Sequence, residues 1–270
     1  MKNKKIVLFV MLALTMAACS TKSVSTPVTS APQESIVPTI TPEAETESAL
    51  LSSGLTMQSS PFEEAGTEPP YTIKAQIPYL EGSTDQRVQN FNTYLKQLVQ
   101  NEIDGFKANT VANASTPPIM AGSSFEMQYT LLGQRGDIWS IQFTVFFFAD
   151  GAAHPGHYSI SVNYDLANGR AVRLDELFLP TVNYLQTISD ICKAELSTRD
   201  IGFDGFSAGA DPTPENYTRW NLSNEGFLVI TFDEYQVAPY VAGPQTVTIP
   251  VSQLQDIADP NGILLSFANQ

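Results

Sequence analysis

The chain has 270 residues, of which 43% are hydrophobic and 16% are charged, and its 28 acidic against 14 basic residues give a formal net charge of −14. This apolar content is enough for a sizeable core, so the composition excludes a wholly disordered protein. The acidity excludes nucleic acid as a partner, because phosphate binding needs Lys and Arg gathered on one face. Two His and two Cys exclude a zinc finger or a disulfide scaffold.

Residues 1–19 have the pattern of a secretory signal peptide. Three lysines precede an apolar run, residues 6–16, that is too short to cross a bilayer. Small residues then stand directly before Cys19, as in the lipobox of bacterial lipoproteins. We therefore expect cleavage before Cys19, acylation of its thiol and a lipid anchor at the extracytoplasmic face of the cell membrane. The alternative is an ordinary signal peptide with a chance Cys at its end.

Residues 20–70 are rich in Ser, Thr, Pro and Glu and contain almost no aromatic side chains. Such a composition cannot bury enough apolar surface to order itself, so we predict a disordered tether. Once the signal is removed, the chain holds 11 basic and 28 acidic residues. The part from Tyr71 onward holds 10 basic and 21 acidic residues. The folded part is therefore expected to be acidic as well.

The folded part is expected to begin with a small α/β subdomain at residues 71–122. Residues 71–80 alternate like a strand, with Pro78 marking an edge or an end. Ser83 or Thr84 can cap the helix that follows. Its apolar stripe consists of Val88, Phe91, Leu95, Leu98 and Phe106.

Residues 123–270 are expected to form a second, β-rich subdomain. Strands are predicted at residues 124–132, 138–149, 158–166, 220–222, 226–232 and 245–250, and helices at 184–196 and 251–257. The strand at 138–149 is apolar on both faces at its end, which predicts a central strand covered on both sides. This order of elements predicts an α+β fold of two subdomains, each an antiparallel sheet packed with helices.

The two histidines of the chain, His154 and His157, lie three residues apart in one loop, with Asp150 just before them. Two imidazoles and a carboxylate can hold zinc, or can act as acid and base if a cleft orients them. The neighbouring glycines and Pro155 favour instead a shaped connection in which the His154 side chain hydrogen-bonds the backbone. A third possibility is a loop that contacts a ligand.

A second loop combines aromatic side chains with Pro, at Tyr235, Pro239 and Tyr240. Exposed aromatic residues of this kind suit contact with a protein or a glycan. The alternative is that the tyrosines pack on the edge of the sheet with their hydroxyls outward.

Several stretches together resemble a bacterial family. They are residues 150–157 (DGAAHPGH), 163–169, 174–178 and 232–243. They are similar to the extracellular domain of the lysozyme-sensing anti-sigma-V factors (RsiV) and to the unit N-terminal to the catalytic domain of PdaC-type peptidoglycan deacetylases. Residues 71–109 resemble the small N-terminal subdomain that precedes this domain. The resemblance covers residues 71–257 and implies an α+β recognition module, which in the anti-sigma factors binds lysozyme.

We therefore expect a binding module without catalytic activity, cofactor or metal. Its expected contact residues are His154, His157, Tyr235, Pro239 and Tyr240. An acidic module attracts a basic partner, so the expected ligand is a cationic protein such as lysozyme, or a peptidoglycan fragment. Neither signalling nor deacetylation is expected, because a lipoprotein signal begins this sequence and no catalytic domain follows before Gln270.

Two other functions stay open at this point. One is an enzyme that modifies cell-wall glycan with the loop of Asp150, His154 and His157, which predicts a cleft or a bound metal. The other is a purely architectural envelope domain, which predicts the absence of a deep pocket.

Overall fold

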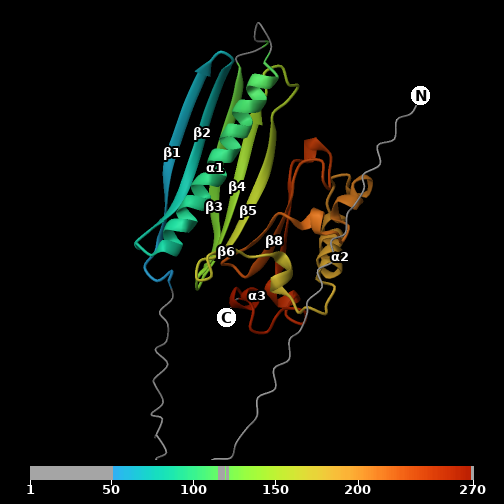
Figure 1. Ribbon diagram of the computed structural model, residues 1–270. Coiled ribbons are helices and arrows are strands. Elements are labelled where there is room, and N and C mark those ends of the chain that lie inside the picture. Colours follow the sequence, from blue (N-terminus) through green and yellow to red (C-terminus); the bar gives the residue numbers. More distant parts are fainter. Residues whose placement is uncertain (1–50, 115–118, 120–121, 269–270) are drawn as a thin grey trace, which may run out of the picture. The chain divides into compact units, whose positions relative to one another are not determined.

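The computed structural model describes residues 51–114, 119 and 122–268. Its strands form a six-stranded sheet of order β1-β2-β3-β4-β5-β6 and a three-stranded sheet of order β7-β8-β9, with helices packed on both (Figure 1). This arrangement confirms the predicted α+β class. None of the described helices is long and apolar enough to cross a membrane. The predicted signal peptide with Cys19, and residues 20–50 of the predicted tether, lie outside the described residues.

The first sheet is mixed rather than purely antiparallel. Its strands are β1 (Thr56–Thr67), β2 (Pro70–Glu81), β3 (Ser123–Arg135), β4 (Ile138–Phe148), β5 (Gly156–Asp165) and β6 (Arg170–Ala171). All neighbours are antiparallel except β2 and β3, which run parallel. Parallel strands need a crossover connection, and α1 (Gln86–Ala112) supplies it while lying across one face of the sheet (Figure 1).

One apolar stripe packs α1 on the sheet. The cap of α1 is Asp85, which accepts a hydrogen bond from Arg87 N at 2.8 Å, in place of the predicted Ser83 or Thr84. Side chains three or four residues apart then face the sheet and are buried: Val88, Phe91, Leu95, Val99 and Ile103. Burying a side chain of this size contributes about 1.5–3 kcal/mol, so this stripe fixes the position of α1.

The three-stranded sheet belongs to a second hydrophobic core, which is built from residues 172–268 together with Ile138 of β4. It contains α2 (Tyr184–Leu196), β7 (Trp220–Leu222), β8 (Phe227–Phe232), β9 (Gln245–Pro250), α3 (Ile263–Ser266) and the short turns η1 (Leu174–Leu177), η2 (Phe203–Gly205), η3 (Ser207–Ala210), η4 (Pro214–Tyr217), η5 (Tyr240–Ala242) and η6 (Val251–Gln253). Strands β7, β8 and β9 and helix α2 confirm the predictions. The helix predicted at 251–257 is wrong beyond η6, because Leu254 N and Ile257 N donate in successive tight turns.

Two predicted boundaries are wrong. Residues 56–67, assigned to the tether, form β1 and pair with β2 along their whole length. Their Ser, Thr and Glu content suits an exposed edge strand, which backbone hydrogen bonds can hold in place without extensive burial.

The boundary at residues 122–123 falls inside one sheet, because β2 pairs with β3. The chain changes sheets only after β6, so residues 71–122 are not a separate subdomain.

A buried network of polar groups joins the two sheets. On the face of β4 and β5 away from α1, Ser140 Oγ donates to Asn163 Oδ1 at 2.6 Å. Asn221 Nδ2, from β7, donates to Ser140 Oγ and to Ile141 O, both at 3.0 Å. Asn163 Nδ2 in turn donates to Trp220 O at 2.7 Å. Buried polar groups must have hydrogen-bond partners, so this network restricts the position of β7 relative to β4 and β5.

The backbones also approach each other closely at this junction. Leu222 N donates to Ser140 Oγ at 2.9 Å. A Cβ added at Gly133 of β3 would lie 2.4 Å from Leu222 O, so the site needs glycine.

The end of β4 departs from the prediction. The strand is central, as expected, but Phe146 and Phe147 at its end are 45% and 39% exposed. The hydrogen bonds of β7, a strand of three residues, reach β4 near Ser140, so β7 does not extend over the end of β4.

We predict that Asn221→Leu destabilises the protein strongly. The substitution removes two hydrogen bonds to β4 and leaves Ile141 O buried without its side-chain partner, which lowers the free energy of unfolding by about 2–4 kcal/mol. Urea unfolding followed by circular dichroism measures it. Asn101→Leu on the exposed face of α1 is the matched control, with an expected change within about 0.5 kcal/mol. A similar effect of both variants would contradict a structural role for the junction.

Candidate functional site

The two loops singled out from the sequence lie against each other. One joins β4 to β5 and the other joins β8 to β9. Tyr240 Oη donates to Pro155 O at 2.7 Å, and the centroid of its ring is 4.0 Å from that of His154. His154 Nδ1 lies 2.9 Å from Pro155 O, so the predicted hydrogen bond of His154 to the backbone is confirmed.

A His–carboxylate pair stands at the centre of this contact. His157 Nδ1 lies 2.7 Å from Glu234 Oε1, and the two side chains are 19% and 10% exposed. Contact of the carboxylate with Nδ1 orients the imidazole. The ring of His157 stacks on Phe146, its partner across the β4–β5 ladder, with centroids 5.5 Å apart. The pair is therefore held by a strand on one side and by a loop on the other.

An ion pair between Asp233 and Arg219 supports the start of the β8–β9 loop. Asp233 Oδ2 accepts from Arg219 Nε at 2.6 Å, and Asp233 Oδ1 accepts from Ser159 N at 3.0 Å. Arg219 Nε also lies 2.9 Å from Ser159 O. These contacts fix Asp233 to β5, and so they set the place of the neighbouring Glu234.

The backbone of Tyr235 is strained. Among the described residues it is the one non-glycine with a positive φ, at 66°. It lies in a turn in which Gln236 N donates to Asp233 O at 3.1 Å. The left-handed conformation costs a side-chain-bearing residue about 1–2 kcal/mol. It leaves the Tyr235 ring 55% exposed beside Tyr240, with centroids 5.8 Å apart, and strain of this kind is often found at functional sites.

An open pocket of about 560 Å³ lies between the two loops. Its lining residues are Phe146, Pro155, Gly156, His157, Glu234, Tyr240, Val241, Ala242 and Gly243. Val241 is 91% exposed, so a large apolar side chain is presented to solvent at its rim. An aromatic and apolar wall with a few polar groups is the usual composition of a binding surface. We call this region the loop surface.

The structure brings most of the predicted contact residues together here. His157 and Tyr240 line the pocket, while the rings of His154 and Tyr235 pack at a tilt against Tyr240. Pro239 precedes η5, is half-buried and does not line the pocket.

Sequence reasoning missed Phe146, Glu234 and Val241. The pattern gave a signal for Phe146, because the end of its strand is apolar at every position, but burial was the wrong interpretation of that signal. Glu234 and Val241 carried no such signal, since only the meeting of two distant loops brings them here.

Asp150 belongs to a different place. Its Oδ2 accepts from Ile119 N at 2.8 Å and its backbone N donates to Ser123 Oγ at 3.0 Å. Within residues 51–114, 119 and 122–268, no three His, Cys, Asp or Glu side chains are grouped as metal ligands would be. The three residues of the proposed joint site have different partners: Ile119 N for Asp150, the Tyr240 ring for His154 and Glu234 for His157.

Comparison with known proteins finds a family match in the second half of the chain. Residues 175–252 match the family described as "Protein of unknown function (DUF3298)", and this stretch includes α2 and β7 to β9.

Two curated relatives are similar to parts of the chain. The peptidoglycan-N-acetylmuramic acid deacetylase PdaC of Bacillus subtilis is 26% identical over 172 residues, which are 63% of this chain and 36% of PdaC. The esterase Rv3036c of Mycobacterium tuberculosis is 30% identical over 116 residues, which are 42% of this chain and 49% of the esterase. The chain thus spans between a third and a half of the length of these relatives. Both are named as enzymes, so this protein has distant relatives with enzymatic names.

Two solved structures share the fold. A DUF3298 family member from Bacteroides fragilis superimposes with a TM-score of 0.61 at 15% identity, covering 79% of this chain and 97% of the other. A DUF3298 family protein from Pseudomonas aeruginosa gives a TM-score of 0.55 at 13% identity, covering 80% and 97%. At such identities the likeness concerns the fold alone.

Proposed function

We propose that this protein is a lipid-anchored extracytoplasmic binding module that recognises a protein ligand through the loop surface without catalysis. The observation that carries the proposal is the exposure of Phe146, Tyr235 and Val241 around one pocket whose wall is the His157–Glu234 pair. Apolar side chains gathered at a rigid, hydrogen-bonded surface are typical of protein interfaces. A purely architectural domain has no need of such a surface.

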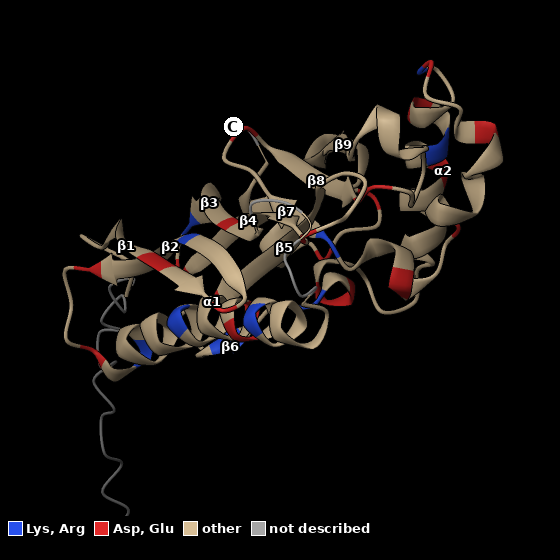
Figure 2. Cartoon of the chain, turned by 90° about the horizontal axis from the view of Figure 1, so that it is seen from above, with Lys and Arg blue, Asp and Glu red and all other residues tan. Residues whose placement is uncertain are grey.

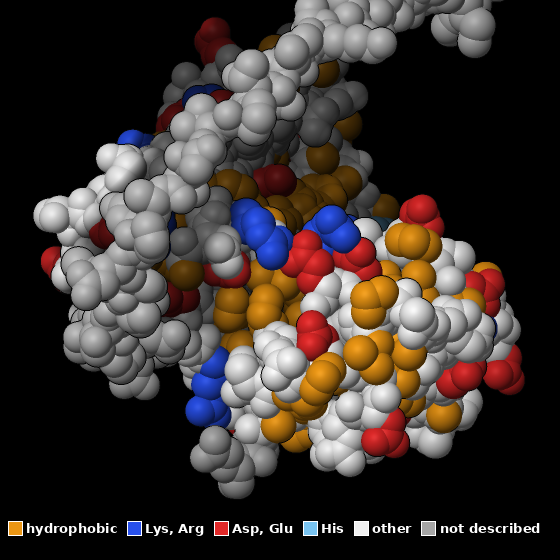
Figure 3. Space-filling model, turned by 60° about the horizontal axis from the view of Figure 1, so that its bottom comes forward, with side chains coloured by type: hydrophobic (Ala, Val, Ile, Leu, Met, Phe, Trp, Pro, Cys, Tyr) orange, Lys and Arg blue, Asp and Glu red, His pale blue; other side chains and the backbone are white. Residues whose placement is uncertain are grey.

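The charge of the described residues supports a cationic partner. Residues 174–268 contain 13 acidic and three basic residues, whereas residues 51–173 contain 11 and seven. Figure 2 shows Lys and Arg along α1 and more Asp and Glu than Lys and Arg around α2. On the face in Figure 3, the basic side chains at the centre lie beside acidic ones, and further acidic side chains are scattered over the face. Such a surface attracts a basic protein and speeds the encounter at low salt.

The proposed ligand is a cationic muralytic enzyme such as lysozyme, with a peptidoglycan fragment as the second possibility. The resemblance of residues 150–157 and 232–243 to the lysozyme-sensing family supports this choice. In this proposal the acyl chain on Cys19 holds the module at the outer face of the cell membrane.

We predict micromolar or tighter binding of lysozyme to the full chain in a calorimetric titration. Val241→Asp and Phe146→Ser should each weaken it about tenfold, because a central apolar contact of an interface is worth about 1–2 kcal/mol. Raising the salt concentration should slow association.

Val111→Asp is the matched control, because Val111 is also exposed but lies near the end of α1. It should bind lysozyme as the wild type does. If neither lysozyme nor soluble peptidoglycan fragments bind at micromolar concentration, the proposed function is wrong. Equal losses for Val111→Asp and Val241→Asp would show that the loop surface is not the contact.

Lipidation at Cys19 can be tested separately from ligand binding. Cys19→Ala removes the thiol that an acyl chain would modify, so the variant should incorporate no labelled palmitate in cells and should leave the membrane fraction. Ser20→Ala, one residue further on, is the control and should remain labelled. Label on the Cys19→Ala chain would contradict lipidation at this position.

An acid–base enzyme is the second candidate, and the His157–Glu234 pair favours it. A carboxylate that orients an imidazole at a pocket wall is a common arrangement for general base catalysis. The names of the two curated relatives agree with this candidate. Among the described residues that line the pocket there is no Ser, Thr or Cys, so an attacking group would have to be water.

If this candidate holds, the protein hydrolyses p-nitrophenyl acetate, and His157→Ala and Glu234→Gln each lower kcat/KM about 100-fold or more. Lys96→Ala on α1 should leave the rate unchanged. Absence of turnover above buffer, or equal rates for all variants, would eliminate the enzyme candidate.

A further inference from the structure

A second, more enclosed cavity lies on the other face of the same sheet. It measures about 320 Å³ and is bounded by the C-terminal part of α1, the β1–β2 turn and the ends of β3, β4 and β5. Its walls are mainly apolar, and Phe106, Phe125 and Phe147 are the largest apolar side chains among them. This volume is at the lower end of the range found for small-molecule sites.

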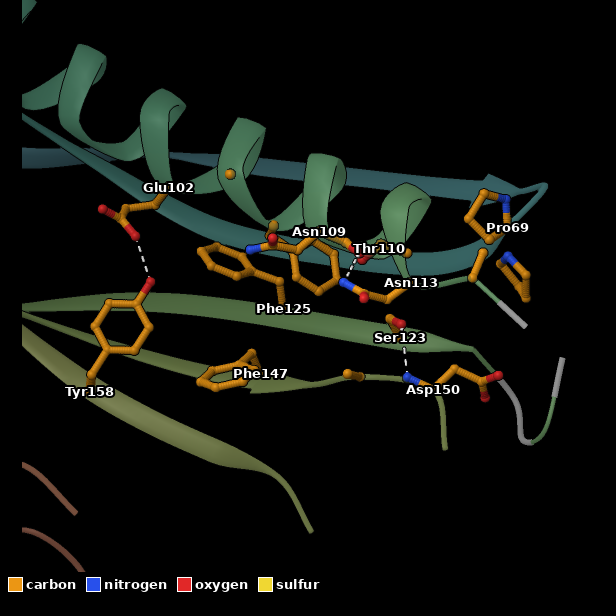
Figure 4. A pocket seen from close by; sticks show the side chains of 15 residues that line it. Pro69, Glu102, Asn109, Thr110, Asn113, Ser123, Phe125, Phe147, Asp150 and Tyr158 are labelled. Carbon is orange, nitrogen blue, oxygen red and sulfur yellow. Dashed lines mark hydrogen bonds between the residues drawn. The ribbon is translucent and has the colours of Figure 1, made fainter. Parts of the chain in front are cut away.

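Polar groups lie at the two ends of the cavity, and aromatic rings lie between them (Figure 4). At one end, Tyr158 Oη donates to Glu102 Oε2 at 2.5 Å. At the other end, Asn113, Ser123 and Asp150 come together where α1 ends. Phe125 and Phe147 stand between these ends. The arrangement suits an elongated molecule with an apolar body and one polar end.

The charges along the cavity are of one sign. Two carboxylates, Glu102 and Asp150, are among its lining residues, and no Lys, Arg or His is found among the described residues of that lining. Lys107, on the same helix, pairs instead with Glu64 of β1. Burial, with the hydrogen bond to Glu102, raises the pKa of Tyr158, so its phenol stays a neutral donor.

Two further contributions to the electrostatic potential of the cavity are also negative. The C-terminal end of α1 carries the negative end of the helix dipole, and the last turn of α1 has no basic residue to offset it. The faces of aromatic rings are negative as well and attract cations. Every nearby contribution therefore favours a positive ligand over a neutral one and disfavours an anion.

Gly105 keeps one wall of the cavity open. It lies inside α1, where glycine is disfavoured relative to residues with a side chain. Close packing does not require it, because nothing beyond the adjacent residues and backbone of α1 itself lies within 4 Å of the place where its Cβ would be. Glu102 and Asn109, one turn before and after it, both line the cavity. A side chain at position 105 would therefore enter the same space.

We propose that this cavity binds a small organic cation with an apolar body, whose ammonium group lies at the Asp150 end and whose body packs between Phe106, Phe125 and Phe147. The site is independent of the loop surface. Neighbouring residues of a strand point to opposite faces, so Phe147 lines the cavity while Phe146 lines the pocket on the other side. Failure of one proposal leaves the other standing.

The test is a calorimetric titration of the full chain with three probes of similar size. They are 2-phenylethylammonium, the neutral 2-phenylethanol and the anionic 3-phenylpropanoate. The ammonium probe should bind about tenfold more tightly than the alcohol, and the carboxylate should show no binding. Equal binding of the ammonium and the alcohol, or binding of the carboxylate, would overturn the assignment of a cation site.

Three variants locate the site. Gly105→Leu fills the cavity from the helix and should abolish binding of both the ammonium and the alcohol. Its melting temperature should be no lower than that of the wild type, because leucine is the better helix former. Ala108→Leu places the same side chain on the exposed face of α1 and should bind normally. Asp150→Asn should weaken the ammonium about fivefold and leave the alcohol unchanged, since it removes the charge but keeps an oxygen acceptor for Ile119 N.

A merely structural role for these residues predicts a different pattern. If Asp150 only holds the loop, Asp150→Asn should affect the ammonium and the alcohol equally, and that result would overturn the proposed position of the ammonium group. Unchanged binding by Gly105→Leu would show that the probes bind elsewhere, which would overturn the site itself. Phe146→Ser, on the opposite face, should leave all three affinities unchanged.

Discussion

The buried hydrogen bonds between β4, β5 and β7 determine the rest of the arrangement. Ser140, Asn163 and Asn221 have almost no contact with water, so each needs a partner from the opposite sheet. An apolar interface tolerates sliding, whereas hydrogen bonds fix both distance and direction. This junction therefore sets how the three-stranded sheet meets β4 and β5. The β8–β9 loop starts from that sheet, and its contact with His154 and His157 depends on the same register.

Because side chains alternate between the two faces of the sheet, β4 and β5 contribute to two different recesses, one on each face. On one face, Phe146 and His157 meet the loop that contains Glu234 and form an open, hydrogen-bonded surface. On the other face, Phe147 and Tyr158 lie under α1 and line a mainly apolar cavity that also has two carboxylates, Glu102 and Asp150, in its walls. One pair of strand ends thus supports a surface suited to a macromolecule and a cavity suited to a small molecule. The two depend on the same strands but not on the same side chains.

Local sequence patterns predicted those helices and strands whose position follows from turn residues or from the spacing of apolar residues. The turns flanked by glycine and the alternation of apolar residues gave β3, β4, β5, β8 and β9, and the stripe from Val88 to Phe106 gave α1. The same reasoning failed for β1, because an exposed edge strand has the composition of a tether and is ordered by pairing with β2. It also failed at Phe146, since an apolar strand end does not reveal whether another element reaches far enough to cover it.

The sequence by itself determined the class of fold, the acidic character and the two loops that carry the contact residues, because these follow from composition and from short-range periodicity. Only the tertiary structure decided that Glu234 pairs with His157, that Asp150 and His157 line different pockets, and that Gly105 leaves a cavity open. These features depend on pairings between residues far apart in the sequence, such as Asn221 and Ser140, which are 81 positions apart. No local pattern records such pairings, because they arise from the register of β4 with its neighbours and from the buried junction with β7.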